Sequence, residues 1–396
     1  EWYWHWLRTR SHNGFVSDFH EKWYGKDFAY QDFAPQFRAE LWNPDEWAEL
    51  FKRAGARYVV LVSKHHDGYA LWPSREASAT RGYPWNSMET GPRRDLCGDL
   101  TEAVRAAGLK MGFYYSFMEW ENPIYDADKA RYVEEHMIPQ IKDLVDRYRP
   151  AILWPDGEWD LPDSVWRSTE ILAWLYNHVD NYEEFAVNDR WGRGLRGQVG
   201  DYYTTEYGNV GGGSPGLKEN KPFEECRGIG HSFAFNRIEN YDDYQTRESL
   251  VQMFIKLVSQ GGSLLLNIGP DADGTIPVIM QDRLIAIGDW LEVNGESIYG
   301  TRKGVLQDLP WGVSTSRGQT LYLHVFDWPE DHTLEVPGLR TPVASARLLH
   351  DPAGSTLPLR EMDDGGVQLD LLGQHPFAHA SVIALELDAE EGTDMI

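Results

Sequence analysis

Cysteine is nearly absent from this chain, which has only Cys97 and Cys226 among its 396 residues. Two cysteines so far apart in the sequence exclude a disulfide framework and any zinc motif built from closely spaced cysteines, and they leave room for one bridge at most. Long apolar runs are absent as well. A helix that spans a bilayer needs about 20 consecutive apolar residues, and the sequence contains no such stretch. The sequence therefore describes a globular chain whose fold depends on a hydrophobic core.

Basic residues are few: 37 lysines and arginines stand against 62 aspartates and glutamates, a formal net charge of -25. Nucleic acids and anionic membranes require a basic face, so this balance argues against both as partners and favours a neutral or positively charged substrate. An acidic surface also serves solubility alone. The chain opens on Glu1-Trp2-Tyr3-Trp4-His5-Trp6, with neither a methionine nor a signal peptide, which predicts a processed or truncated form or a fragment.

Aromatic residues, in contrast, are abundant. They make up 13% of the chain, with 17 Trp and 20 Tyr, which is more indole than a core needs. Indole faces stack on the apolar face of a pyranose, although large cores also consume tryptophan. With 42% hydrophobic residues the chain can bury one large domain and a smaller one.

Short apolar runs alternate with helical periods from Asn43 to about Ile298, a pattern typical of βα units and a parallel sheet. Asn43-Pro44-Asp45-Glu46 marks the start of a helix, because Asn43 is a cap residue and acids follow in the first turn. The glycines at 55, 108 and 261 mark helix ends. The candidate strands are Arg57 to Ser63, Leu109 to Tyr115, Ala151 to Trp154, Phe185 to Asn188, Asp201 to Thr205, a weaker one at Ser232 to Phe235, and Leu264 to Ile268.

These seven strands are one short of a closed (β/α)8 barrel of the TIM type. An open barrel exposes a sheet edge, so we expect either a first strand upstream of Glu1 or one wrong strand among the seven. Beyond Tyr299 short alternating strands predict an antiparallel β-sandwich. We therefore expect a barrel-like catalytic domain over residues 1–302 and a sandwich domain over residues 303–396, with the glycine-rich run 211–216 as a loop over the site.

Polar side chains follow several of these strands, where barrel enzymes gather their active sites. One strand runs into Lys64-His65-His66-Asp67-Gly68, whose histidines suit hydroxyl recognition, a structural hydrogen bond or a metal, although no further ligand cluster completes a metal shell. Asp156, flanked by Trp154 and Trp159, is a candidate nucleophile beside sugar platforms, with Glu158 and Asp160 close by. Arg190 could bond hydroxyls, orient a carboxylate or form a structural ion pair.

Glycoside hydrolysis requires a second carboxyl group, because one group attacks or activates water while another protonates the leaving oxygen. Glu206 follows one strand, and Glu224 and Glu225 lie further on; the residues alone do not rank them. Phosphate-binding glycine loops are absent, and Asn267 to Gly274 lacks the spacing of an EF-hand. We expect no cofactor and no metal.

At these positions the chain resembles the α-L-fucosidases of glycoside hydrolase family 29, in order over about residues 1–302. It looks closest to the branch that includes the animal lysosomal enzymes, because of Trp159, Pro162 and the opening Glu1 to Trp6. The matching runs are Trp47 to Phe51, Gly55 to Leu61, Lys64 to Gly68, Leu71 to Ser74, Trp154 to Trp159, Val187 to Gly192 and Gly261 to Pro270.

This resemblance implies a retaining exo-hydrolase with a (β/α)8-like barrel, a C-terminal β-sandwich and no cofactor. Asp156 matches the family nucleophile, and Glu206 matches the acid/base of one branch, with Glu225 as the alternative. The positions that match fucose-binding residues are Glu1, Trp2, His65, His66, Tyr114, Trp154 and Arg190. Two features depart from the family: a His-Trp-Gly motif at the end of a first strand has no counterpart, and Pro155 replaces a small polar residue, which restricts Trp154 to extended geometry.

The leading hypothesis is a retaining α-L-fucosidase that removes terminal fucose from an oligosaccharide or glycoconjugate. If the barrel truly lacks its first strand, the alternative is a fucose-binding protein with impaired catalysis. A third reading keeps the chemistry and changes the sugar to an isosteric one, such as β-D-galactose or L-galactose. The sequence leaves homo-oligomer formation, compartment, linkage and aglycone open.

Overall fold

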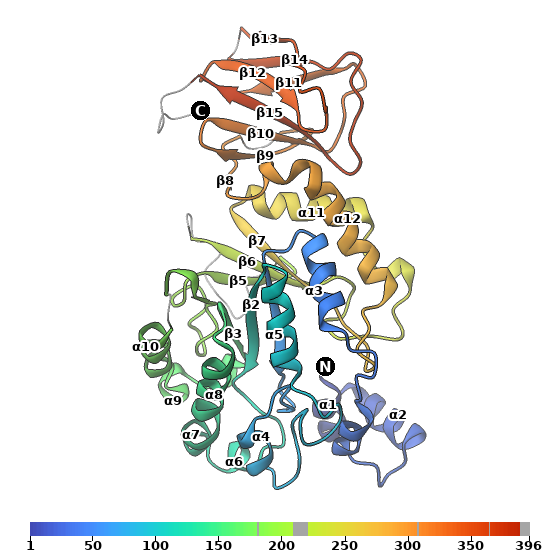
Figure 1. Cartoon of the computed structure of the whole chain (residues 1–396), viewed down its shortest axis with the longest axis vertical. Coiled ribbons are helices and arrows are strands. Elements are labelled where there is room, and N and C mark those ends of the chain that lie inside the picture. Colours follow the sequence, from blue (N-terminus) through green and yellow to red (C-terminus); the bar gives the residue numbers. More distant parts are fainter. Residues whose placement is uncertain (180–181, 209–220, 307–308, 364, 389–396) are drawn as a thin grey trace.

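The computed structural model describes residues 1–179, 182–208, 221–306, 309–363 and 365–388. The loop predicted over residues 211–216 lies outside these ranges. The chain begins with two short helices, α1 (Tyr3–Thr9) and α2 (Phe15–Trp23), which the sequence patterns did not indicate. They lie together at one end of the molecule, beside the N-terminus (Figure 1).

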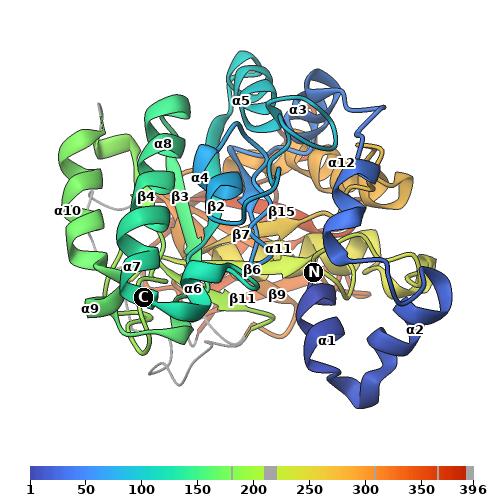
Figure 2. The same cartoon turned by 90° about the horizontal axis from the view of Figure 1, so that it is seen from below.

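Four parallel strands form the first sheet in the order β1-β2-β3-β4. They are β1 (Tyr58–Lys64), β2 (Lys110–Ser116), β3 (Ile152–Asp156) and β4 (Ala186–Val187). The helices between and around them are α3 (Pro44–Arg53), α4 (Arg75–Ala79), α5 (Leu96–Ala106), α6 (Pro123–Ala127), α7 (Lys129–Tyr132), α8 (Ile138–Tyr148), α9 (Asp163–Trp166) and α10 (Ser168–His178). Viewed from below, α3, α5, α8 and α10 lie on the outside of the strands (Figure 2).

A second parallel sheet has the order β5-β6-β7, with β5 (Tyr203–Glu206), β6 (Phe223–Gly228) and β7 (Gly262–Asn267). Two long helices follow, α11 (Arg247–Ser259) and α12 (Val278–Asn294). The predicted cap at Asn43 is confirmed: its side chain accepts the Glu46 amide at the start of α3. At the start of α11, Thr246 accepts the Ser249 amide in the same way. These side chains satisfy amides that have no partner inside the helix.

One strand prediction is wrong. The weak strand expected at Ser232 to Phe235 is a bend, and the sixth strand is β6, which starts at Phe223. The sequence patterns assign no strand to this segment and supply only two candidate acids from it, Glu224 and Glu225. Both are buried, and each carboxylate accepts hydrogen bonds from neighbouring strands or turns, which removes most of the cost of burying it.

The described strands form two separate parallel sheets and not a closed barrel. Residues of β1 and β7 line the same large cavity, Val59 to Val62 on one side and Leu264 to Leu266 on the other. The predicted α/β architecture is thus confirmed in its coarse form, as parallel strands covered by helices.

The last part of the chain is a β-sandwich, as predicted, and it packs on the end of the molecule where α11 and α12 lie (Figure 1). Its two antiparallel sheets have the orders β12-β15-β10-β9-β8 and β11-β14-β13. The strands are β8 (Arg302–Lys303), β9 (Gly312–Arg317), β10 (Thr320–Val325), β11 (Thr333–Pro337), β12 (Val343–Leu348), β13 (Leu359–Glu361), β14 (Gly366–Asp370) and β15 (Ser381–Leu387). A domain boundary between residues 302 and 303 stays a prediction.

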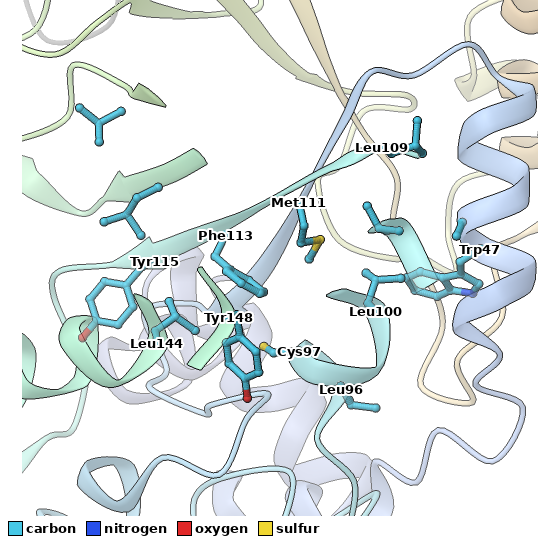
Figure 3. Packing of buried hydrophobic residues seen from close by; sticks show 14 of the residues in the cluster. Trp47, Leu96, Cys97, Leu100, Leu109, Met111, Phe113, Tyr115, Leu144 and Tyr148 are labelled. Carbon is cyan, nitrogen blue, oxygen red and sulfur yellow. The ribbon is translucent and has the colours of Figure 1, made fainter. Parts of the chain in front are cut away.

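Strand β2 packs its outward side chains against the helices. Met111, Phe113 and Tyr115 lie among Cys97, Leu100, Leu144 and Tyr148 of α5 and α8 (Figure 3). Both cysteines are free and buried, so the one bridge that the sequence left open is not formed.

Candidate active site

The predicted site residues gather around a cavity of about 1480 Å³ that the carboxyl ends of β1, β2, β3 and β5 approach. Parallel strands bring their carboxyl ends to one edge, which is why residues from distant parts of the chain meet there. The cavity is lined by Asp156 and Glu206 and by all seven positions that the family resemblance implied for substrate binding, namely Glu1, Trp2, His65, His66, Tyr114, Trp154 and Arg190.

Asp156 is the last residue of β3 and is almost fully buried. Gly157 follows with a φ of +75°, and a Cβ at this position would lie 2.9 Å from Met118 Cγ, so only glycine lets the chain turn here. The nitrogen Nη1 of Arg190 donates a hydrogen bond of 2.5 Å to Oδ1 of Asp156, and the Tyr114 hydroxyl donates one of 2.6 Å to Oδ2. Both carboxylate oxygens are therefore held in place.

Electrostatics keep this carboxylate ionised. Burial alone raises the pKa of Asp156, but the charge of Arg190, with smaller contributions from His66 and Tyr114, lowers it to about 2. An ionised carboxylate at the end of a cavity is a competent nucleophile at any pH above about 3.

Arg190 connects Asp156 to Glu206. Its Nη2 lies 3.1 Å from Oε1 of Glu206, while Nε donates to the Thr204 hydroxyl at 3.0 Å. The guanidinium also lies 4.3 Å from the centre of the Trp154 ring, a cation–π contact that fixes its plane. The carboxyl groups of Asp156 and Glu206 thus each contact one terminal nitrogen of the same guanidinium, and both line the cavity.

Glu225, the alternative partner, is placed differently. It is buried, it does not line the cavity, and its carboxylate accepts hydrogen bonds from the Thr205 hydroxyl and from the Gly208 amide. Glu206, by comparison, has a side chain that is 37% exposed and faces the cavity. Glu206, and not Glu225, therefore lines the cavity and shares Arg190 with Asp156.

The two histidines after β1 both reach the cavity; His66 is buried and His65 is partly buried. Burial lowers the pKa of His66 to about 4 and holds that of His65 well below its usual value, with the neighbouring His66 as the next cause. His66 Nδ1 lies 2.6 Å from the Ser116 hydroxyl, and its Nε2 lies 3.9 Å from Asp156. Neutral imidazoles can donate and accept hydrogen bonds, which suits sugar hydroxyls.

Trp154 lines the cavity and contacts several of its other residues. Its ring stacks on Tyr114 with 5.6 Å between centroids, and its Nε1 donates to Glu224 at 2.7 Å. Glu224 also accepts the Tyr58 hydroxyl at 2.5 Å, so one carboxylate links β6 to β1 and β3. Burial raises the pKa of this carboxyl group, and the two donors counteract the shift.

Several residues of the site had no clear signal in the sequence. Trp120 packs against Trp2 and His66, with ring centroids 4.9 and 5.2 Å apart, and its amide donates to the His66 carbonyl oxygen. The preceding residue, Glu119, is fully buried. Its carboxylate oxygens lie 2.7 Å from Nζ of Lys64, 3.1 Å from Nη2 of Arg81 and 2.7 Å from Nε2 of His136. These partners come from distant segments, so spacing along the chain gives no hint of them.

Two acids near Asp156 lie outside the cavity lining. Glu158 is buried and pairs with Arg196 at 2.9 Å, and Asp160 accepts the Tyr125 hydroxyl and lies 3.5 Å from Lys129. Both therefore support the turn after Asp156. In the described ranges, no group of three or more His, Cys, Asp or Glu side chains is arranged to hold a metal ion.

Comparison with known proteins identifies the family. A family model described as alpha-L-fucosidase matches residues 1–296. The chain belongs to the α-L-fucosidase family. It is a glycoside hydrolase of the α-L-fucosidase type, as the resemblance in its motifs predicted. No helix within the described residues is both long and apolar enough to cross a membrane.

Curated relatives agree with this assignment. The α-L-fucosidase of Dictyostelium discoideum is 40% identical over 347 residues, which cover 84% of this chain and 73% of that protein. The tissue α-L-fucosidase of Homo sapiens is 37% identical over 366 residues, 87% of this chain and 74% of the human protein. The predicted relation to the animal enzymes is confirmed.

Solved structures share the fold. The α-fucosidase of Thermotoga maritima is 32% identical with a TM-score of 0.79, covering 97% of this chain and 88% of that one. The same enzyme in complex with fucose is 31% identical, with a TM-score of 0.78 and the same coverage. The α-L-fucosidase of Bacteroides thetaiotaomicron, solved as a trapped covalent intermediate, is 24% identical and shows the fold alone.

Proposed function

We propose that this chain is a retaining exo-α-L-fucosidase in which Asp156 is the nucleophile and Glu206 the acid/base. The observation that carries this assignment is the pair of carboxyl groups on one guanidinium, one buried and ionised, the other exposed to the cavity. Retention needs two carboxyl groups only about 5 to 5.5 Å apart, one on each face of the anomeric carbon. Contact with neighbouring nitrogens of Arg190 is compatible with that spacing.

In the first step an oxygen of Asp156 forms a bond to the anomeric carbon while the bond from that carbon to the leaving oxygen breaks. Glu206 gives its proton to the departing oxygen. In the second step the Glu206 carboxylate takes a proton from water, the water oxygen bonds to the anomeric carbon, and the bond to Asp156 breaks. One water is consumed and both side chains return to their starting states.

The remaining cavity residues hold fucose. Neutral His65 and His66 are suited to hydroxyl groups, and the stacked rings of Tyr114 and Trp154 offer an apolar surface to the sugar. Glu1 and Trp2 also line the cavity, and the Trp2 ring packs against His66 with 5.6 Å between centroids. Because the imidazoles carry no charge near pH 7, a neutral sugar fits this pocket.

We assign the catalytic part to a (β/α)8-like barrel over residues 1–302 and the sandwich to residues 303–396. The alternative of a fucose-binding protein without turnover finds no support in the comparisons, whose named relatives are fucosidases. Aryl glycosides of the isosteric sugars β-D-galactose and L-galactose, assayed in competition with the aryl α-L-fucoside, test the choice of sugar. The substrate is a terminal α-L-fucosyl residue of an oligosaccharide or glycoconjugate.

Azide rescue tests both roles. The variant Asp156→Gly should lose turnover of an aryl α-L-fucoside and, with azide, should yield the β-configured fucosyl azide, because azide enters where the nucleophile was. The variant Glu206→Ala should yield the α-configured azide, because Asp156 still forms the intermediate. Normal turnover by Asp156→Gly would refute the assignment of the nucleophile, and a β-azide from Glu206→Ala would refute that of the acid/base.

A further inference from the structure

The side of the cavity next to Glu206 carries an aromatic side chain that the mechanism does not use. Tyr207 follows Glu206 directly, and 38% of its surface is exposed. Its backbone has a φ of +49°, in the left-handed region that a bulky residue rarely adopts, because Cβ crowds the backbone there. Such conformations persist only where surrounding contacts hold them, and they gather at functional sites.

Contacts on several sides hold the Tyr207 ring. The Gly228 amide donates to its hydroxyl oxygen at 3.1 Å, and the guanidinium of Arg227 lies 5.0 Å from the ring centre. Phe233 meets the ring edge to face with 5.6 Å between centroids. A ring that is fixed before a ligand arrives loses little conformational freedom on binding, which favours affinity.

Tyr207 lies beside the cavity and not in its lining: it borders a neighbouring hollow together with Arg227 and His231. Its neighbour Phe233 lines the cavity and packs against the buried cluster of Tyr114, Trp154 and Cys226. Glu1, which also lines the cavity, is close enough that its charge adds to burial in raising the pKa of the Tyr207 phenol. The aromatic lining of the pocket thus continues outward on the Glu206 side.

The leaving group has to pass this surface, because the acid that protonates the departing oxygen stands on the face from which that oxygen leaves. We propose that Tyr207, backed by Phe233, is the platform on which the first sugar of the leaving group stacks. The ligand is a neutral pyranose that presents a face of C–H groups to the ring. This inference rests on the proposed role of Glu206, and it makes Tyr207 a determinant of specificity and not a catalytic residue.

The test compares a glycan with a small leaving group. Tyr207→Gly removes the ring and keeps the backbone at Glu206, because glycine adopts a positive φ freely. We expect kcat/KM for 2′-fucosyllactose to fall about 3- to 10-fold, and that for α-L-fucosyl fluoride to change less than about twofold. Tyr207→Phe should keep the glycan activity. Tyr241→Gly is the matched control, since Tyr241 is exposed, has Arg283 4.9 Å from its ring centre and lines neither the cavity nor the hollow that Tyr207 borders.

Equal losses for both substrates would overturn the proposal, because the ring would then act on fucose or on Glu206. Unchanged activity on both would overturn it as well. Wild-type protein that hydrolyses neither substrate would refute the proposed function, and calorimetry in the Asp156→Asn background then tests the platform alone. There, Tyr207→Gly should weaken binding of 2′-fucosyllactose but not of fucose, and equal affinities would refute the platform.

Discussion

Replacing Arg190 by methionine should release the carboxyl group of Asp156 from the charge that keeps it ionised. Methionine has a similar length but no charge, so the buried carboxylate loses its 2.5 Å partner. The pKa of Asp156 is lowered from 3.8 to about 2 in the native protein. A difference of nearly two pKa units corresponds to about 2 to 3 kcal/mol, since each unit is about 1.4 kcal/mol.

The sign of the effect follows from this lowered pKa. A carboxyl group with a native pKa below its unfolded value stabilises the fold at pH values above about 4, and that contribution disappears as the pH falls towards 2. Arg190→Met should therefore lower the free energy of unfolding at pH 7 by at least about 2 kcal/mol, because the Tyr114 hydrogen bond remains but the charge that offset most of the cost of burying the carboxylate is gone. The difference from the wild type should shrink as the pH falls from 4 towards 2.

Urea unfolding at a series of pH values measures this difference, and the pH profile of kcat/KM for an activated aryl fucoside follows the same ionisation. We expect the acid limb of Arg190→Met to lie above pH 4 and that of the wild type to lie below. Arg283→Met is the control, since Arg283 is equally buried, lies 2.5 Å from Asp282 and does not line the cavity. An acid limb that stays below pH 4 in Arg190→Met would refute the reasoning.

Three further variants have distinct expected outcomes. Glu225→Gln should change kcat less than about twofold, whereas Glu206→Gln should reduce it about 100-fold or more for substrates with poor leaving groups; similar losses in both would contradict the choice between them. Tyr114→Phe removes the donor to Oδ2 of Asp156, so kcat/KM should fall about tenfold and the acid limb should move upwards; an unchanged profile would count against this contact. Glu119→Ala leaves the Lys64 charge buried without its partner, so the free energy of unfolding measured in urea should fall by about 3 to 5 kcal/mol. A fall of less than about 1 kcal/mol would contradict this expectation and show that the surrounding side chains rearrange.

Features that depend on neighbouring residues could be read from the sequence. The cap at Asn43 is local, because its side chain meets an amide three residues later. The position of Asp156 at the end of an apolar strand is local too, and the geometry of parallel sheets then brings such strand ends together. That is why the predicted residues share one cavity.

Features that depend on distant partners could not be read. Strand β6 was missed because Glu224 is tolerated in a buried strand only through Tyr58 and Trp154, which lie far away in the sequence. The sequence leaves the choice between Glu206 and Glu225 as the candidate acid/base open for the same reason. The hydrogen bond that the Thr205 hydroxyl donates to Glu225 forms only when β5 and β6 pair. Periodicity also gave no sign of α1 and α2, which bring Trp2 to the site.

The contact between Arg190 and Glu206 joins two separately hydrogen-bonded sheets. Asp156 ends β3 and Arg190 follows β4 in the first sheet, whereas Glu206 ends β5 in the second. The separation of the two carboxyl groups therefore depends on how the two sheets are aligned. If both groups act as proposed, we expect substitutions that shift this alignment to change turnover even where they lie far from either carboxylate.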